Sequence, residues 1–214
     1  MAISKFNYNS FNVTPVASNA LSFNSNADGF TTQGASSMVL IKTLTASTSG
    51  TLNFVDGASS VVLDDTYPVY VFKFINLHPD ASDAQFGFQV SINTGSAYGV
   101  AITSSAIESY HGGVQYGGNN DLAQGTGLQN ITNTVYHSRA EESMNGTLHL
   151  FNPSSTTFVK HFMSRASRMN NTNFIEHLHG GYVNSTSAVD AIQFKFAAGN
   201  IATGTIKLYG IKDS

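Results

Sequence analysis

The sequence predicts an all-β protein, an antiparallel β-sandwich of jelly-roll-like form with about eleven short strands and an irregular N-terminal arm. Short apolar runs are separated by turn residues at roughly the spacing of a sandwich. Several runs alternate apolar and polar side chains with a period of two, as a half-buried strand does. No segment carries an apolar stripe of helical period over three turns, and strands without intervening helices favour an antiparallel sandwich or barrel over a parallel α/β sheet.

The first segment, residues 1–36, is polar and weakly patterned, and we expect an arm there. Its asparagines are interleaved with four aromatic residues, Phe6, Tyr8, Phe11 and Phe23. One interpretation is an irregular arm that packs these aromatic side chains onto the body of the same chain. The other is an assembly arm that docks on a neighbouring subunit, because polar segments without a core of their own often become ordered on binding.

Residues 37–214 contain no internal repeat and no linker, so we expect a single β-sandwich domain. Within the run 69–77, the side chains of Tyr70, Phe72 and Phe74 fall on one face of a strand. The runs that predict strands are, in chain order, 38–46, 51–55, 69–77, 85–92, 98–103, 131–137, 147–151, 156–164, 174–183, 191–197 and 204–211.

Two segments lie outside this pattern. Gly112–Gln129 contains six of the 19 glycines and is expected to form one long loop, and a loop longer than about 15 residues in a compact domain is usually functional or mobile. Ser104–Tyr110 is the only stretch with a briefly helical pattern. Aromatic and amide side chains near loop glycines suit the binding of a sugar, although they also serve as ordinary loop anchors. The predicted binding residues are Tyr98, Tyr110, His111, Tyr116, Asn119 and Asn120.

Charged residues make up only 11% of the chain, whereas Ser, Thr and Asn together supply 66 of its 214 residues. The net charge of −3 argues against a nucleic-acid partner, because phosphate neutralisation needs clustered Lys and Arg. The lack of cysteine removes disulfides, thiolate nucleophiles and thiolate metal sites. The N-terminal residues show no signal peptide, and no apolar run approaches the ~20 residues that cross a bilayer. We therefore expect synthesis in the cytoplasm without membrane insertion.

Enzyme motifs are missing from the sequence: there is no GxSxG elbow, no Walker loop and no HExxH. Glycan hydrolysis would need two carboxylates held ~5–10 Å apart across a cleft. Each candidate carboxylate is instead interpreted as a solvated surface group, and we expect no catalytic residues. These candidates are Glu108, Asp121, Glu141, Glu142, Glu176 and Asp190.

The seven histidines are numerous for a chain with so few charges, and His177 and His179 form a pair. Side chains two residues apart in a strand project from the same face, so the two imidazoles are expected to stand side by side. One pair is only half a metal site, but three copies around a threefold axis would supply six nitrogens to a transition metal. The alternative is that both are ordinary surface or packing histidines. No other cofactor is expected.

Three segments carry a resemblance to a known group: KFNYNSFNVTPVASNALSFNSNADGF, LHLFNPSSTTFVKHFMSR and AVDAIQFKFAAGNIATGTIKLYGIKDS. They resemble small, tail-fibre-like virion proteins of tailed bacteriophages that infect marine cyanobacteria and other marine bacteria. The similarity spans nearly the whole chain and is most specific in FNPSSTT and GTIKLYGI. It implies a β-sandwich fold and a place in the virion, on the tail or on the head. It supplies no catalytic residues.

These observations together predict a non-enzymatic virion structural protein, a short tail fibre or fibre tip that contacts the host surface. One alternative is a capsid decoration protein that clamps neighbouring capsid subunits through the arm 1–36. An alternative from another class is a glycan-binding module, with a polysaccharide depolymerase as its enzymatic form. The expected partners are other virion proteins and a host surface glycan. Closed cyclic symmetry is usual for homo-oligomers, and a fibre tip favours a homotrimer.

Overall fold

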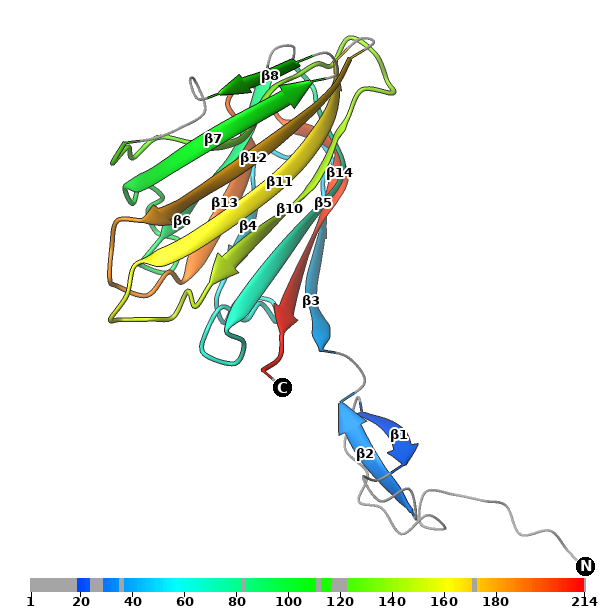
Figure 1. The fold of residues 1–214 in the computed structure, drawn as a ribbon, viewed down its shortest axis with the longest axis vertical. Coiled ribbons are helices and arrows are strands. Elements are labelled where there is room, and N and C mark those ends of the chain that lie inside the picture. The colour runs from blue at the N-terminus through cyan, green and yellow to red at the C-terminus, as the bar shows by residue number, and fades with distance from the viewer. Residues whose placement is uncertain are drawn as a thin grey trace, which may run out of the picture. The chain divides into compact units, whose positions relative to one another are not determined.

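The computed structural model describes residues 19–23, 29–34, 37–81, 84–110, 113–116, 123–170 and 173–213. Within these ranges all regular secondary structure is β-strand (Figure 1). The chain divides into two compact units, Met1–Ser37 together with Ser214, and Met38–Asp213. The prediction of an all-β fold is therefore confirmed.

The N-terminal unit contains a two-stranded antiparallel hairpin of β1 (Asn19–Phe23) and β2 (Phe30–Gly34). Phe23 and Phe30 are opposite each other in the register, and their rings stack with centroids 5.1 Å apart. The side chain of Phe23 is 67% exposed. The expectation of a wholly irregular arm was wrong for these strands, because the five paired residues of each strand satisfy one another's backbone hydrogen bonds. The other predicted arm residues, Phe6, Tyr8 and Phe11, lie outside the described residues.

The second unit is a sandwich of two antiparallel sheets, one of eight strands and one of four among the residues described. The larger sheet has the order β3 (Met38–Thr45), β14 (Ile201–Ile211), β5 (Val69–Pro79), β10 (Met144–Phe151), β11 (Lys160–Asn170), β12 (Asn173–Val183), β7 (Ile102–Tyr110) and β8 (Gly113–Tyr116). The smaller sheet has the order β4 (Leu52–Val55), β13 (Ala191–Phe196), β6 (Ala84–Ser91) and β9 (Gln129–Val135).

Eight of these strands pair in a nested way, the first with the last and so on inward. β3 pairs with β14, β4 with β13, β5 with β10, and β6 with β9, every pair antiparallel. These eight strands thus follow the course of a long two-stranded hairpin. The additional pairs, β14 with β5 and β13 with β6, join its segments side by side into two sheets. The remaining four strands are two insertions, β7–β8 and β11–β12, which extend the larger sheet.

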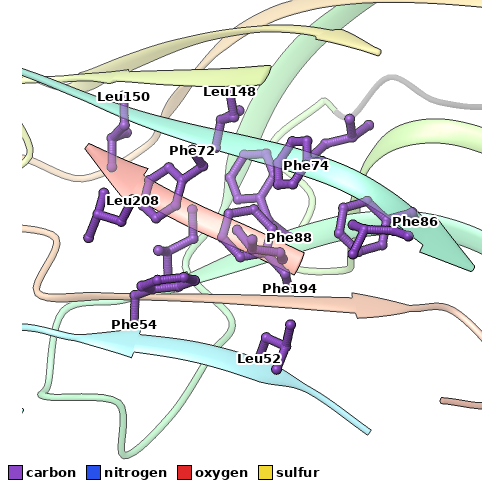
Figure 2. Close-up of a cluster of buried hydrophobic side chains, with 14 of the residues drawn as sticks. Leu52, Phe54, Phe72, Phe74, Phe86, Phe88, Leu148, Leu150, Phe194 and Leu208 are labelled. Carbon is purple, nitrogen blue, oxygen red and sulfur yellow. The ribbon is translucent and has the colours of Figure 1, made fainter. Parts of the chain in front are cut away.

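Phenylalanine side chains fill the space between the two sheets (Figure 2). Period-two alternation directs Phe72 and Phe74 of β5 inward from the larger sheet, as the sequence predicted, and both are buried. Phe194 of β13 faces them from the smaller sheet, with ring centroids 5.1 and 5.2 Å away. Phe162 of β11 in the larger sheet also meets Phe88 of β6 in the smaller sheet, with ring centroids 5.1 Å apart. Aromatic burial across the sandwich is therefore what holds the two sheets together.

Four sequence expectations differ from the structure. The run 98–103 becomes a strand only from Ile102 onward. Ser104–Tyr110 is not helical but belongs to strand β7. The expected loop Gly112–Gln129 contains the short strand β8 and the first residue of β9. The run 156–164 becomes a strand only from Lys160 onward, because the residues before it form a turn in which Thr157 and Phe158 donate backbone hydrogen bonds to Ser155 Oγ.

Candidate functional site

The structure distributes the predicted binding residues over separate places. Tyr98 lies in the loop between β6 and β7, whereas Tyr110 ends β7, where it is opposite Gly113 and Ile175 in the register. Tyr116 is the last residue of β8. The remaining three, His111, Asn119 and Asn120, lie outside the described residues.

Tyr98 is part of a surface hollow of about 410 Å³. The hollow is formed by the loop after β6 and by the residues that follow β12. No residue that lines it carries a charge, and the lining includes Ile92, Asn93, Tyr98, Gly99, Val100 and Asn184. The hollow thus combines aromatic, aliphatic and amide groups, the combination typical of sites for small neutral ligands.

Hydrogen bonds fix the Asn93 side of this hollow. The buried Ser91 hydroxyl accepts from the backbone N–H groups of Asn93 and Gly95, at 3.1 and 3.0 Å, and donates to Asn93 Oδ1 at 2.7 Å. Asn93 Oδ1 also accepts from the backbone N–H of Ala97 at 3.0 Å. Gly95 has a φ of 74°, which suits glycine in this tight turn. The amide oxygen of Asn93 is therefore held by the turn, which orients its Nδ2 group.

The Asn184 side is anchored to the neighbouring strands. The Asn184 backbone N–H donates to Ala101 O at 2.8 Å, and its side chain exchanges hydrogen bonds with Thr103 Oγ1. Below it, the buried Lys160 Nζ donates to Ser185 O at 3.1 Å and to Phe158 O at 3.2 Å. Burial lowers the pKa of Lys160. These hydrogen bonds anchor this wall of the hollow to β7, β11 and the residues around them.

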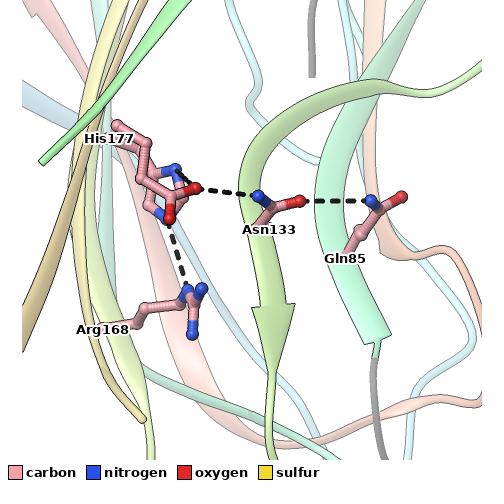
Figure 3. A network of polar contacts seen from close by, with 5 residues as sticks. Gln85, Asn133, Arg168 and His177 are labelled. Atoms are coloured by element: carbon pink, nitrogen blue, oxygen red, sulfur yellow. Dashed lines mark hydrogen bonds and ion pairs between the residues drawn. The ribbon is translucent and has the colours of Figure 1, made fainter. Parts of the chain in front are cut away.

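A second polar feature, which we call the Arg–His–Glu network, lies between the sheets and consists of Arg168, His177 and Glu108. Figure 3 shows Arg168 and His177 of this network. Arg168 Nε donates to His177 Nε2 at 3.2 Å, so the imidazole proton must sit on Nδ1, which lies 3.6 Å from Glu108 Oε2. The side chain of His177 is 1% exposed. Burial, reinforced by the positive charge of Arg168, lowers the pKa of His177 to about 3.

The network continues into the smaller sheet. Asn133 Nδ2 of β9 donates to Glu108 Oε2 at 2.8 Å, and Gln85 Nε2 of β6 donates to Asn133 Oδ1 at 3.3 Å (Figure 3). The chain of contacts therefore crosses from β11 and β12, through β7, to β9 and β6. It joins the inserted strands to the edge of the smaller sheet, where polar rather than apolar side chains fill the interior.

The histidine pair is placed differently from the expectation. His177 and His179 do share one face of β12, with ring centroids 6.3 Å apart, but that face is the inner one, and His179 is 4% exposed. Arg168 already occupies the Nε2 lone pair of His177. A six-nitrogen site on a trimer axis does not fit this arrangement, because both imidazoles are buried inside the chain. The described residues contain no group of three or more His, Cys, Asp or Glu that could hold a metal ion.

The candidate carboxylates are also less uniformly solvated than expected. Glu108 belongs to the Arg–His–Glu network, and Glu142 is buried and accepts a hydrogen bond from Ser138 Oγ at 3.3 Å. Glu176 pairs with Arg165 at 2.5 Å on the outer face of the larger sheet. Asp190 Oδ2 accepts from the backbone N–H of Thr94 at 2.8 Å, and Asp121 lies outside the described residues.

Comparison of this chain with protein-family models, with curated proteins and with solved structures finds no match. Among the described residues there is also no helix long and apolar enough to span a membrane. The function must accordingly be argued from the geometry of the chain itself.

Proposed function

We propose that this chain is a non-enzymatic structural protein of a bacteriophage particle, a short tail fibre or fibre tip that contacts the host surface. The observation that carries the proposal is the nested pairing of β3 with β14 through β6 with β9. We infer from it a jelly roll with two insertions, a topology that recurs in viral capsid and lectin domains. The resemblance of three sequence segments to phage virion proteins points the same way.

The uncharged hollow at Tyr98 favours a subunit that touches a surface glycan, and hence the tail position. The alternative position, a decoration protein on the capsid, is favoured by the separate N-terminal unit, which suits a clamp. Either position makes the chain part of the virion.

Labelling of purified phage particles with an antibody against this chain distinguishes the positions. We expect signal at the end of the tail. Label on the capsid faces alone would contradict the tail-fibre position and support the decoration protein. Absence of the chain from washed particles would contradict both positions.

We further propose that the subunit is a homotrimer that assembles through its N-terminal hairpin. A two-stranded hairpin is marginally stable by itself, and this one exposes the stacked pair Phe23 and Phe30. Packing this pair on a neighbouring subunit would remove apolar area from water, worth ~25 cal/mol per Å².

The double variant Phe23→Ser, Phe30→Ser is expected to shift the protein from trimer to monomer, because it removes this apolar contact. Light scattering coupled to gel filtration at micromolar concentration measures the shift against the chain mass of 22.8 kDa. Phe158→Ser is the matched control, since Phe158 is 70% exposed on the other unit. A monomeric wild-type protein, or a double variant that remains trimeric, would refute the role of the hairpin.

A further inference from the structure

We infer that the hollow at Tyr98 is a binding site for a neutral sugar ring. The inference deepens the proposed function, on which it rests only for its biological setting, by naming the site and the chemical class that the subunit would contact. It extends the sequence prediction, which included Tyr98 but neither Asn93 nor Asn184.

The chemistry of the hollow matches a pyranose. A sugar ring has an apolar face of C–H groups and a rim of hydroxyls. The Tyr98 ring and the 39% exposed side chain of Ile92 offer apolar surface. Asn93 and Asn184 place amide groups in the same hollow, and amides can both donate to and accept from hydroxyls.

The site is also held in place before a ligand arrives. Ser91 and the backbone N–H of Ala97 fix the Asn93 side chain, and Thr103 fixes that of Asn184. Fixed polar groups lose little conformational entropy on binding, which favours a weak ligand such as a monosaccharide. A volume of about 410 Å³ falls in the range of small-ligand sites.

Charge selects against acidic sugars. The lining residues are uncharged. The pKa of the Tyr98 hydroxyl is raised by burial and, second, by the negative charge of the Asp190 carboxylate. A carboxylate on the sugar would meet that negative charge, and no Lys or Arg lines the hollow to compensate it. Lys160 lies behind the hollow, but it is buried and its Nζ already donates to Ser185 O and Phe158 O. Neutral hexoses are therefore expected to bind better than uronic acids.

Saturation-transfer difference NMR on the purified full-length protein tests the inference. The probes are the methyl glycosides of glucose, galactose and mannose, with glucuronate as the acidic comparison. We expect at least one neutral glycoside to bind, and glucuronate to bind more weakly. Tyr98→Ala should weaken binding about tenfold, which corresponds to ~1.4 kcal/mol, whereas Tyr98→Phe should retain the stacking face and bind nearly as wild type.

Two further variants separate the hollow from the rest of the surface. Tyr182→Ala removes a half-buried tyrosine of β12 that does not line the hollow, and it should leave binding unchanged. Gly95→Ala would place a Cβ 3.0 Å from Tyr98 Oη and 3.2 Å from Val55 Cγ2, at a positive φ, and should weaken binding while the aromatic ring remains. Unfolding midpoints of all variants verify that the domain is intact.

Failure of all three neutral glycosides to bind, or equal binding by wild type and Tyr98→Ala, would overturn the inference. Tighter binding of glucuronate would overturn the assignment to neutral sugars. These results are independent of the particle: virion labelling without sugar binding refutes this site alone, and sugar binding by a chain absent from virions refutes the proposed function alone.

Discussion

Between pH 6.5 and pH 3, His177 is expected to reduce the free energy of unfolding by about 1.4 kcal/mol for each unit that the pH falls. The pKa of this imidazole is about 3 in the folded protein, below its ordinary value of 6.5, because it is buried beside Arg168. Below pH 6.5 the unfolded chain takes up a proton at this site that the folded chain refuses. Above pH 6.5 the neutral His177 therefore leaves the free energy of unfolding undiminished, and this free energy decreases as the pH falls from 6.5 toward 3.

Urea unfolding followed by circular dichroism at a series of pH values measures this slope. His177→Gln offers Arg168 Nε an amide oxygen in place of Nε2 and cannot titrate, so its slope over this window should be smaller by the contribution of one proton. The same substitution at His149 is the matched control. Burial lowers the pKa of His149 as well, but this residue lies in β10, outside the Arg–His–Glu network. Identical slopes for wild type and His177→Gln would contradict the burial of a neutral imidazole.

Phe194→Ala is expected to destabilise the domain by about 3–5 kcal/mol, the usual cost of emptying a phenylalanine site in a core. The Phe194 ring lies among those of Phe54, Phe72, Phe74, Phe86 and Phe88, with centroids 5.1 to 6.4 Å away. Its loss therefore removes contacts to both sheets at once (Figure 2).

The measurement is the unfolding free energy at pH 7 from urea titration. Phe158→Ala removes the same ring from an exposed position and should change the free energy by less than about 0.5 kcal/mol. Comparable losses in the two variants would mean that Phe194 is not the centre of the core.

The sequence predicted strands best where the buried face is apolar. In β5 and β13 the inward residues are aromatic or aliphatic, so the period-two pattern is visible without the structure. Within Ser104–Tyr110 of β7, the residues that share a face with Glu108 are Ser104, Ala106 and Tyr110, and this face looks toward the Arg–His–Glu network. The apolar Ile107 lies on the exposed outer face instead, so alternation does not mark Ser104–Tyr110 as a half-buried strand.

The inward position of the histidine pair could have been predicted. His177 and His179 share their face of β12 with Ile175 and Val183, which are apolar and buried. The same-face rule that pairs the two histidines also places them on the buried face of the strand. By contrast, the meeting of Asn184 with Tyr98 depends on the packing of the loops after β6 and β12, which no local pattern encodes.

The nested pairing also constrains the time at which the protein can become folded. β14 is the last strand to be synthesised, yet it lies between β3 and β5, the first and third strands of the domain. Until the ribosome has released β14, β3 has no partner in its sheet and the edge of β5 that β14 covers is exposed. Pairings so distant in sequence are slow to form and leave edges open to aggregation. Folding should therefore complete only after β14 has left the ribosome, and chains truncated before Ile201 should collect in the insoluble fraction of an expressing cell.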